Sequence, residues 1–324
     1  MINTHGFFIA GQPLTHTAAA SQPTRQFLLE GTTDVYEVLP QQHRFETGEG
    51  PIYPALGKKL LPAVDALEQT IGQLGKHPTP EEADRSNIRR LIRVMLTLSS
   101  AYQDSYPDKK LAKATRKLKR VASAIGKYKD HGILQQKVDE LYPDGVPKKI
   151  QKRLDAHLEK REGQFQKAYR KFRKEDLAYV VDVLSRPASL DGTRSPRDIE
   201  QADRARLSGH LSGLVDEVEK VGLTHHDPHE FHQGRKALRW VLLTAQGTHD
   251  VLPIPNPAVE AMSELVNGFG VAQDSCIAWE WLRDEGFKSE AKKMQTEYWE
   301  LHNLEVCAAV RFLKGGHLEQ LRSV

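Results

Sequence analysis

Hydrophobic residues recur along most of this chain at the spacing of an α-helix. In 108–125, Leu111, Leu118 and Ile125 fall on one side of a helix, together with Val121 and Ala122. The apolar side of 148–184 is formed by Ile150, Leu154, Leu158, Phe165, Tyr169 and Phe172. The pattern predicts an all-α protein with helices at about 54–74, 80–104, 108–141, 148–185, 196–221, 228–247, 257–284 and 288–314.

Four sequences that combine a capping residue with proline mark predicted helix starts. The side-chain oxygen of the cap accepts a hydrogen bond from a free backbone N–H, and proline in the first turn has no N–H to leave unpaired. These signals are Thr79-Pro80, Ser195-Pro196, Asp227-Pro228 and Asn256-Pro257. Two glycines, Gly126 and Gly270, are expected to kink the long helices that contain them.

Residues 1–53 lack this periodicity and form a separate predicted segment. Their apolar residues are scattered among Gly and Pro, with one candidate short strand at Gln26–Glu30. We expect the segment to wrap over the helices in extended form or to be partly disordered. No run of 18 or more apolar residues occurs, and the N-terminus is a poor secretory signal, so a cytoplasmic protein without a membrane helix is expected. Cys276 and Cys307 form no CxxC pair.

Charge is distributed unevenly along the chain. Residues 85–174 contain 25 Lys and Arg against 9 Asp and Glu, a net charge of +16, whereas the whole chain carries only +3. A basic block between acidic flanks favours a polyanionic partner. A set of solvated helix faces is the alternative explanation, because charge counts do not show whether the side chains converge in space.

The two halves of the chain resemble each other. The helical sequences 89–97 and 236–244 align at an offset of 147, which pairs Arg89 with Lys236. Further on, 126–133 aligns with 270–277 at an offset of 144, which pairs Gly126 with Gly270. We therefore predict two four-helix bundles related by a pseudo-twofold axis, at 54–186 and 187–324.

These repeated residues carry a resemblance to the CHAD family, the conserved histidine α-helical domain. The family pattern is roughly His-x-x-Arg-x-x-x-Arg/Lys-x-x-Arg on one helix, followed by Leu-Gly-x-x-Arg/Asn-Asp. The second half is similar through His229, His232, Lys236, Arg239, Gly270 and Asp274, and the first half through Arg85, Arg89, Arg93, Gly126 and Asp130. This chain departs from the pattern at Glu82, which replaces the first histidine, and at His232, which replaces an arginine.

The resemblance implies a module that binds inorganic polyphosphate in a central basic channel between the two bundles, with association with polyphosphate granules as a further expectation. No catalytic role and no cofactor are expected. Arg85, Arg89 and Arg93 are expected to stack on one helix face, because they are four residues apart, and guanidinium groups match phosphate oxygens. The candidate binding residues are Arg85, Arg89, Arg90, Arg93, Lys109, Lys113, Arg116, Arg120, Lys127, Lys129, His229, His232, Lys236 and Arg239.

Two other functions remain open from the residues alone. A nucleic-acid-binding helical protein would need aromatic side chains for base stacking, and the basic half offers only Tyr102, Tyr106 and Tyr128 near helix ends. A metal-dependent phosphohydrolase would use the histidine-rich stretch 225–232. Asp227 is better suited to cap a helix than to bind metal, and the sequence lacks the common nucleophile and phosphate-loop motifs.

Overall fold

The computed structural model describes residues 51–324, so nearly all of the predicted N-terminal segment and its candidate strand lie outside the described residues. Within 51–324 the chain is helical and contains no strand, which confirms the all-α prediction. None of the helices in this range is long and apolar enough to cross a membrane.

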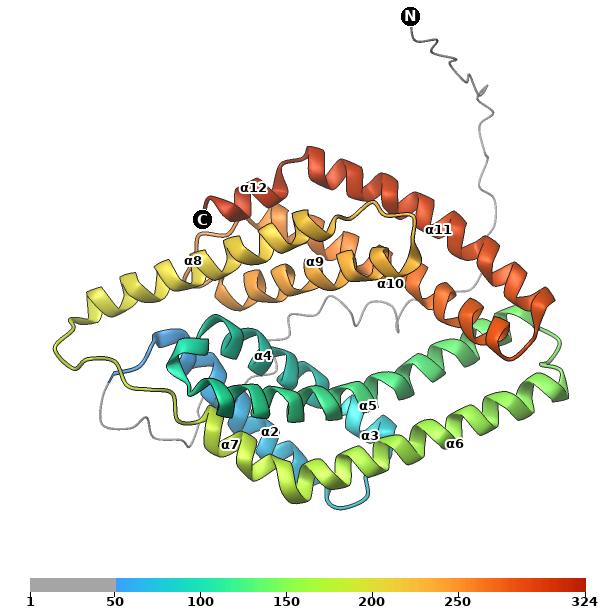
Figure 1. Cartoon of the computed structure of the whole chain (residues 1–324), viewed down its shortest axis with the longest axis horizontal. Helices are drawn as coiled ribbons and strands as arrows, with labels where there is room; N and C mark the ends of the chain where they lie inside the picture. The colour runs from blue at the N-terminus through green and yellow to red at the C-terminus, as the bar shows by residue number, and fades with distance from the viewer. Residues whose placement is uncertain (1–50) are drawn as a thin grey trace, which may run out of the picture.

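The helices form two layers that follow one another in the sequence (Figure 1). The lower layer contains a π-turn at Leu56–Leu60, α2 (Leu61–Leu74), α3 (Pro80–Arg85), α4 (Ile88–Ala101), a 3-10 turn at Gln103–Ser105, α5 (Asp108–Leu141), α6 (Lys148–Lys171), a second π-turn, η3 (Phe172–Asp176), and α7 (Leu177–Leu184). The upper layer contains α8 (Pro196–Val221), α9 (Pro228–Thr248), α10 (Asn256–Asp284), α11 (Lys288–Lys314) and α12 (His317–Arg322). The layers meet where α4 contacts α9 and α5 contacts α10.

Three of the four predicted helix caps are present. Thr79 and Ser195 each form a capping box with the acidic residue three positions later. The Asp227 carboxylate accepts hydrogen bonds from the backbone N–H groups of His229 and Glu230, at 2.9 and 3.0 Å. The prediction for Asn256 is wrong, because the helix begins at Asn256 itself and Pro255 occupies the cap position.

The helix predicted at 80–104 is divided into α3 and α4. Asn87 adopts a left-handed conformation (φ 62°), which asparagine tolerates better than most residues, and the helix ends before it. Arg85 therefore lies on α3, whereas Arg89 and Arg93 lie on α4. In contrast, α5 and α10 run without interruption through Gly126 and Gly270, and α12 follows the predicted last helix.

The buried side of α5 changes along its length. Leu118 belongs to the main hydrophobic core, which extends through both layers. Val138, twenty residues later and therefore on the opposite side of the helix, belongs to a second, smaller core. There the α5–α6 hairpin packs against the α10–α11 hairpin through residues that include Leu154, Leu282 and Phe287. Between these two packed regions, the middle of α5 faces the junction of the layers.

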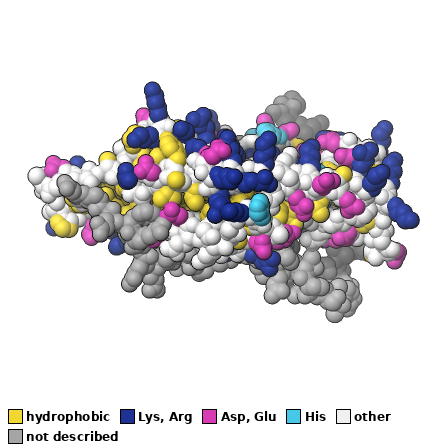
Figure 2. Space-filling view, turned by 90° about the horizontal axis from the view of Figure 1, so that it is seen from below, with side chains coloured by type: hydrophobic (Ala, Val, Ile, Leu, Met, Phe, Trp, Pro, Cys, Tyr) yellow, Lys and Arg dark blue, Asp and Glu magenta, His cyan; other side chains and the backbone are white. Residues whose placement is uncertain are grey.

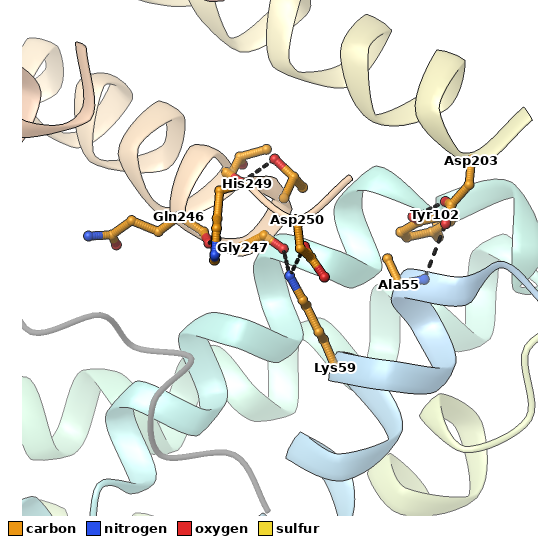
Figure 3. Close-up of polar contacts among 10 residues, drawn as sticks. Ala55, Lys59, Tyr102, Asp203, Gln246, Gly247, His249 and Asp250 are labelled. Carbon is orange, nitrogen blue, oxygen red and sulfur yellow. Dashed lines mark hydrogen bonds and ion pairs between the residues drawn. The ribbon is translucent and has the colours of Figure 1, made fainter. Parts of the chain in front are cut away.

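Polar contacts also join the layers, near the start of the described chain (Figure 3). The buried Asp203 on α8 accepts hydrogen bonds from the Tyr102 hydroxyl and from the backbone N–H of Ala55 (3.1 Å). Lys59 donates to the Gly247 carbonyl and pairs with Asp250. These contacts hold the beginning of the lower layer against α8 and the end of α9.

Candidate functional site

Four arginines from the two layers converge where α4 packs against α9. Arg89 and Arg93 lie four residues apart on α4, and Arg235 and Arg239 have the same spacing on α9, so each pair lies on one helix face. All four side chains are half-buried. We call Arg89, Arg93, Arg235 and Arg239 the arginine cluster.

The charges of the arginine cluster act on one another across the layers. Burial, followed by the positive charges of Arg239 and Arg89, lowers the pKa of Arg93 to about 9. Burial, followed by the charges of Arg235 and Arg89, likewise lowers the pKa of Arg239 to about 9. The guanidinium groups of Arg93 and Arg239 are thus held partly buried beside like charges, an arrangement that a bound anion would stabilise.

A glycine on the neighbouring helix makes room for one arginine of each pair. A Cβ atom on Gly126 would lie 3.4 Å from Nη2 of Arg89, and a Cβ atom on Gly270 would lie 2.9 Å from Nη2 of Arg235. Arg89 and Arg235, 146 residues apart, thus make similar approaches to a glycine of the next long helix. Lys236, which the sequence alignment pairs with Arg89, is exposed.

One aspartate from α5 and one from α10 accompany these arginines. Burial raises the pKa of Asp274 to about 6, although the positive charges of Arg235 and Lys137 act against this rise. Asp130 lies at the edge of the site, and its side chain is exposed on one side. The protein around it still raises the pKa of its carboxyl by desolvation, against the charges of Arg89 and Arg161. A third carboxylate, that of Asp84, lies 3.9 Å from Nη1 of Arg89. These carboxylates balance part of the charge of the arginine cluster and favour a fixed position for its guanidinium groups.

Two buried nitrogens at this site have no hydrogen-bond partner among residues 51–324. They are Nε of Arg235 and Nδ1 of His232. Burial, followed by the charges of Lys236 and Arg235, lowers the pKa of His232 to about 4, so its ring is neutral at pH 7. Because an unpaired buried donor is costly, the Arg235 nitrogen favours the approach of an acceptor such as a phosphate oxygen.

Three of the predicted residues line a different place on the lower layer. Lys113, Arg116 and Arg120 border a cleft of about 470 Å³, which we call the α5 cleft. Its lining is completed by Lys117, Lys171, Glu175 and Asp176. The basic residues of 85–174 are therefore divided between at least two locations.

The other predicted residues lie around these two places. Arg85, Lys109, Lys127 and His229 are exposed, whereas Arg90 and Lys129 are half-buried. The charges of Arg90 and Lys129 act on Arg93 and on Asp274, respectively. Sequence analysis missed Arg235, Lys117 and Arg161. The four-residue spacing from Arg235 to Arg239, identical to that from Arg89 to Arg93, was the signal that could have identified Arg235.

The residues of the two alternative functions have other partners. Nδ1 of His225 lies 3.1 Å from Glu230, and His229 is exposed at the start of α9. No group of three or more His, Cys, Asp or Glu side chains in 51–324 is arranged to hold a metal ion. Of the tyrosines considered for base stacking, Tyr102 and Tyr106 are buried, and their hydroxyls donate to Asp203 and to the Leu184 carbonyl.

Comparison with known proteins gives one match. A family model described as the CHAD domain matches residues 65–283, which include α4, α5, α9 and α10. No curated protein and no solved structure matches the chain.

Proposed function

Because the chain belongs to the CHAD domain family, we propose that it binds inorganic polyphosphate without transforming it, through the arginine cluster between the layers. The resemblance to this family implies polyphosphate as the partner. The arrangement of the arginines supports the same chemistry independently of the family.

The observation that carries the proposal is the convergence of four half-buried arginines from α4 and α9. A guanidinium group donates two parallel hydrogen bonds to a phosphate and keeps its charge when partly buried, whereas lysine acts as a point charge. Four such half-buried groups close together match an anion that offers several phosphates in succession. An anion at this position would also accept a hydrogen bond from Nε of Arg235.

The contacts between the layers support a pair of related repeats around this site. α4 contacts α9, which is its counterpart in the predicted repeat, and α5 contacts α10, its own predicted counterpart. In both Arg89–Gly126 and Arg235–Gly270, an arginine lies close to a glycine of the next long helix. A pseudo-twofold axis between the layers would therefore pass close to the arginine cluster, and a chain without direction, such as polyphosphate, could contact both halves alike.

A flexible single chain fits this location better than a nucleic acid duplex. α4 and α9 are in contact, and packed helices have axes about 8–10 Å apart, so the space between them is narrow compared with a B-DNA duplex. Stacking of unpaired bases would need exposed aromatic rings, whereas Tyr102 and Tyr106 are buried and Tyr128 is half-buried.

A competition experiment tests this function. Fluorescently labelled long-chain polyphosphate is titrated with the full-length protein, and duplex DNA or unlabelled polyphosphate is added at equal phosphate concentration. We expect polyphosphate to displace the probe at much lower concentration than DNA. The variant Arg93→Gln/Arg239→Gln should bind polyphosphate at least tenfold more weakly, since each lost charge-assisted contact is worth about 1.5–3 kcal/mol.

The matched control is Lys160→Gln/Lys174→Gln, which removes the same charge from exposed positions in the described chain. It should change the affinity by less than about threefold. Tighter binding to duplex DNA than to polyphosphate at equal salt would contradict the proposal, as would equal losses in the two double variants.

A further inference from the structure

The α5 cleft carries an inference that goes beyond the arginine cluster. Its walls come from the first half of α5, the end of α6 and the π-turn η3. Five cationic side chains and two carboxylates line it, which leaves a net charge of +3. Figure 2 shows Lys and Arg side chains gathered over the middle of the face that α6 and α7 form.

The π-turn and a buried acid shape one wall of the cleft. The continuous helical stretch from α6 to α7 widens at Phe172–Asp176, and Asp176 is only 1% exposed. Its carboxylate pairs with Lys117, and Nη1 of Arg120 lies 3.6 Å from it. Isolated π-turns inside helices often mark functional sites. Here the turn places an acid where it fixes two basic side chains of α5 in the wall of the cleft.

The other α5 cations of the cleft are free to bind an anion. No carboxylate among residues 51–324 lies within ion-pair distance of Lys113 or Arg116, and both side chains are exposed. The ammonium groups of Lys113 and Lys117 lie 4.7 and 5.4 Å from the centre of the Tyr179 ring. A cation–π contact of this kind orients a lysine without neutralising its charge.

The cleft and the arginine cluster are separate sites. None of the residues that line the cleft belongs to the cluster. Arg120, the nearest lining residue on α5, is six residues before Gly126, a distance of about 9 Å along the helix. Six residues make about one and two-thirds turns of the helix. The two positions are therefore about 120° apart around its axis, and the two sites face different directions.

We propose that the α5 cleft binds a compact small molecule that carries several phosphate groups, independently of the arginine cluster. A cleft of about 470 Å³ lies within the range of small-molecule sites, roughly 300–1,000 Å³. Its charge is concentrated in a concave wall, whereas a solvated lysine face would spread it along a convex helix. Lys113 and Arg116 contact the phosphates, and Asp176 positions Lys117 and Arg120 beside them.

Calorimetry with inositol hexakisphosphate as the probe tests this site on the full chain. The variant Lys113→Gln/Arg116→Gln should bind the probe about tenfold more weakly or worse, because two unpaired cations are lost. Both positions are exposed, so the variant should fold normally. The control Lys109→Gln/Lys119→Gln removes the same charge from exposed positions on the same helix and should change the affinity by less than about threefold.

A second pair of measurements separates this site from the polyphosphate site. Arg93→Gln/Arg239→Gln should leave binding of inositol hexakisphosphate within about threefold of wild type, and Lys113→Gln/Arg116→Gln should do the same for long-chain polyphosphate. If Lys113→Gln/Arg116→Gln loses polyphosphate binding, the bound polyphosphate extends into the α5 cleft, and the cleft is not an independent site. Absence of probe binding, an equal loss in the Lys109/Lys119 control, or stronger binding of duplex DNA at the cleft would also overturn the proposal.

Discussion

The guanidinium of Arg235 lies against the backbone of Gly270, so close that a Cβ atom there would come within 2.9 Å of Nη2. Gly270→Ala should therefore displace Arg235 and weaken polyphosphate binding several-fold. Because alanine favours a helix over glycine by about 1 kcal/mol, the melting temperature should stay the same or rise. Fluorescence titration and thermal circular dichroism measure the two effects.

Gly126→Ala is the matched variant on α5, beside Arg89. The distance to Nη2 of Arg89 would be 3.4 Å, which is close to ordinary contact. A smaller loss of affinity than in Gly270→Ala is expected, with the same gain in helix stability. If Gly270→Ala lowers stability and leaves binding intact, the glycine serves packing rather than the position of Arg235.

The arginine cluster should reduce the stability of the protein without its ligand. The fold lowers the pKa values of Arg93 and Arg239 to about 9, so keeping these groups charged at pH 7 costs free energy. Arg239→Met should raise the melting temperature by roughly 2–4 °C for each kcal/mol recovered, while it weakens polyphosphate binding. Differential scanning calorimetry without and with polyphosphate measures both; Arg170→Met, at an exposed position, is the control. A lower melting temperature in Arg239→Met would show that its attraction to Asp274 outweighs the repulsion.

Polyphosphate affinity should increase as the pH falls from about 7 to 5. The pKa of Asp274 is raised to about 6 from an ordinary 3.8, so its carboxyl gains a proton in this interval. A bound anion disfavours the charged carboxylate and raises this pKa further. The affinity then gains up to about tenfold for each unit between the free and bound pKa values. Asp274→Asn should bind polyphosphate more tightly at pH 7 and make the affinity less dependent on pH. If the pH dependence of the affinity is the same in Asp274→Asn as in the wild type, Asp274 does not cause it.

The polar contacts at Asp203 should affect stability and leave binding unchanged. This buried carboxylate accepts hydrogen bonds from Tyr102 and from the Ala55 backbone, so Asp203→Ala leaves two buried donors unpaired. Each unpaired donor costs about 1–3 kcal/mol. Thermal denaturation should show a clear drop in melting temperature, and Asp250→Ala, whose partner Lys59 is nearer the surface, should show a smaller one. Weaker polyphosphate binding by folded Asp203→Ala would contradict this separation.

Much of the fold follows from local signals in the sequence. The starts at Pro80, Pro196 and Pro228 were predictable because a cap and a proline act within one helical turn. The break at Asn87 was not, because the sequence around it continues the apolar spacing of a helix. The choice of a left-handed conformation there depends on how α3 and α4 pack.

The site was predictable in its chemistry and less so in its geometry. Arg89 and Arg93 were identified from their spacing and Arg239 from the resemblance to the family pattern, whereas Arg235 was missed because the alignment of the two halves paired Lys236 with Arg89. Only the contacts of Arg89 with Gly126 and of Arg235 with Gly270 distinguish the two registers. The α5 cleft depends on a π-turn and on Asp176. Asp176 is at least 56 residues along the sequence from the α5 side chains that it faces, so no local sequence pattern could have predicted that they lie together.

The salt dependence of polyphosphate binding tests the role of the arginine cluster most directly. Each contacted phosphate should add about 0.7 to the slope of log affinity against log salt, by analogy with single strands, which gives roughly −3 for one contact from each of the four arginines. Arg93→Gln/Arg239→Gln should flatten this slope by about 1.4, and Lys160→Gln/Lys174→Gln should leave it unchanged. An unchanged slope in the arginine variant, or equal flattening in both, would contradict binding at the arginine cluster.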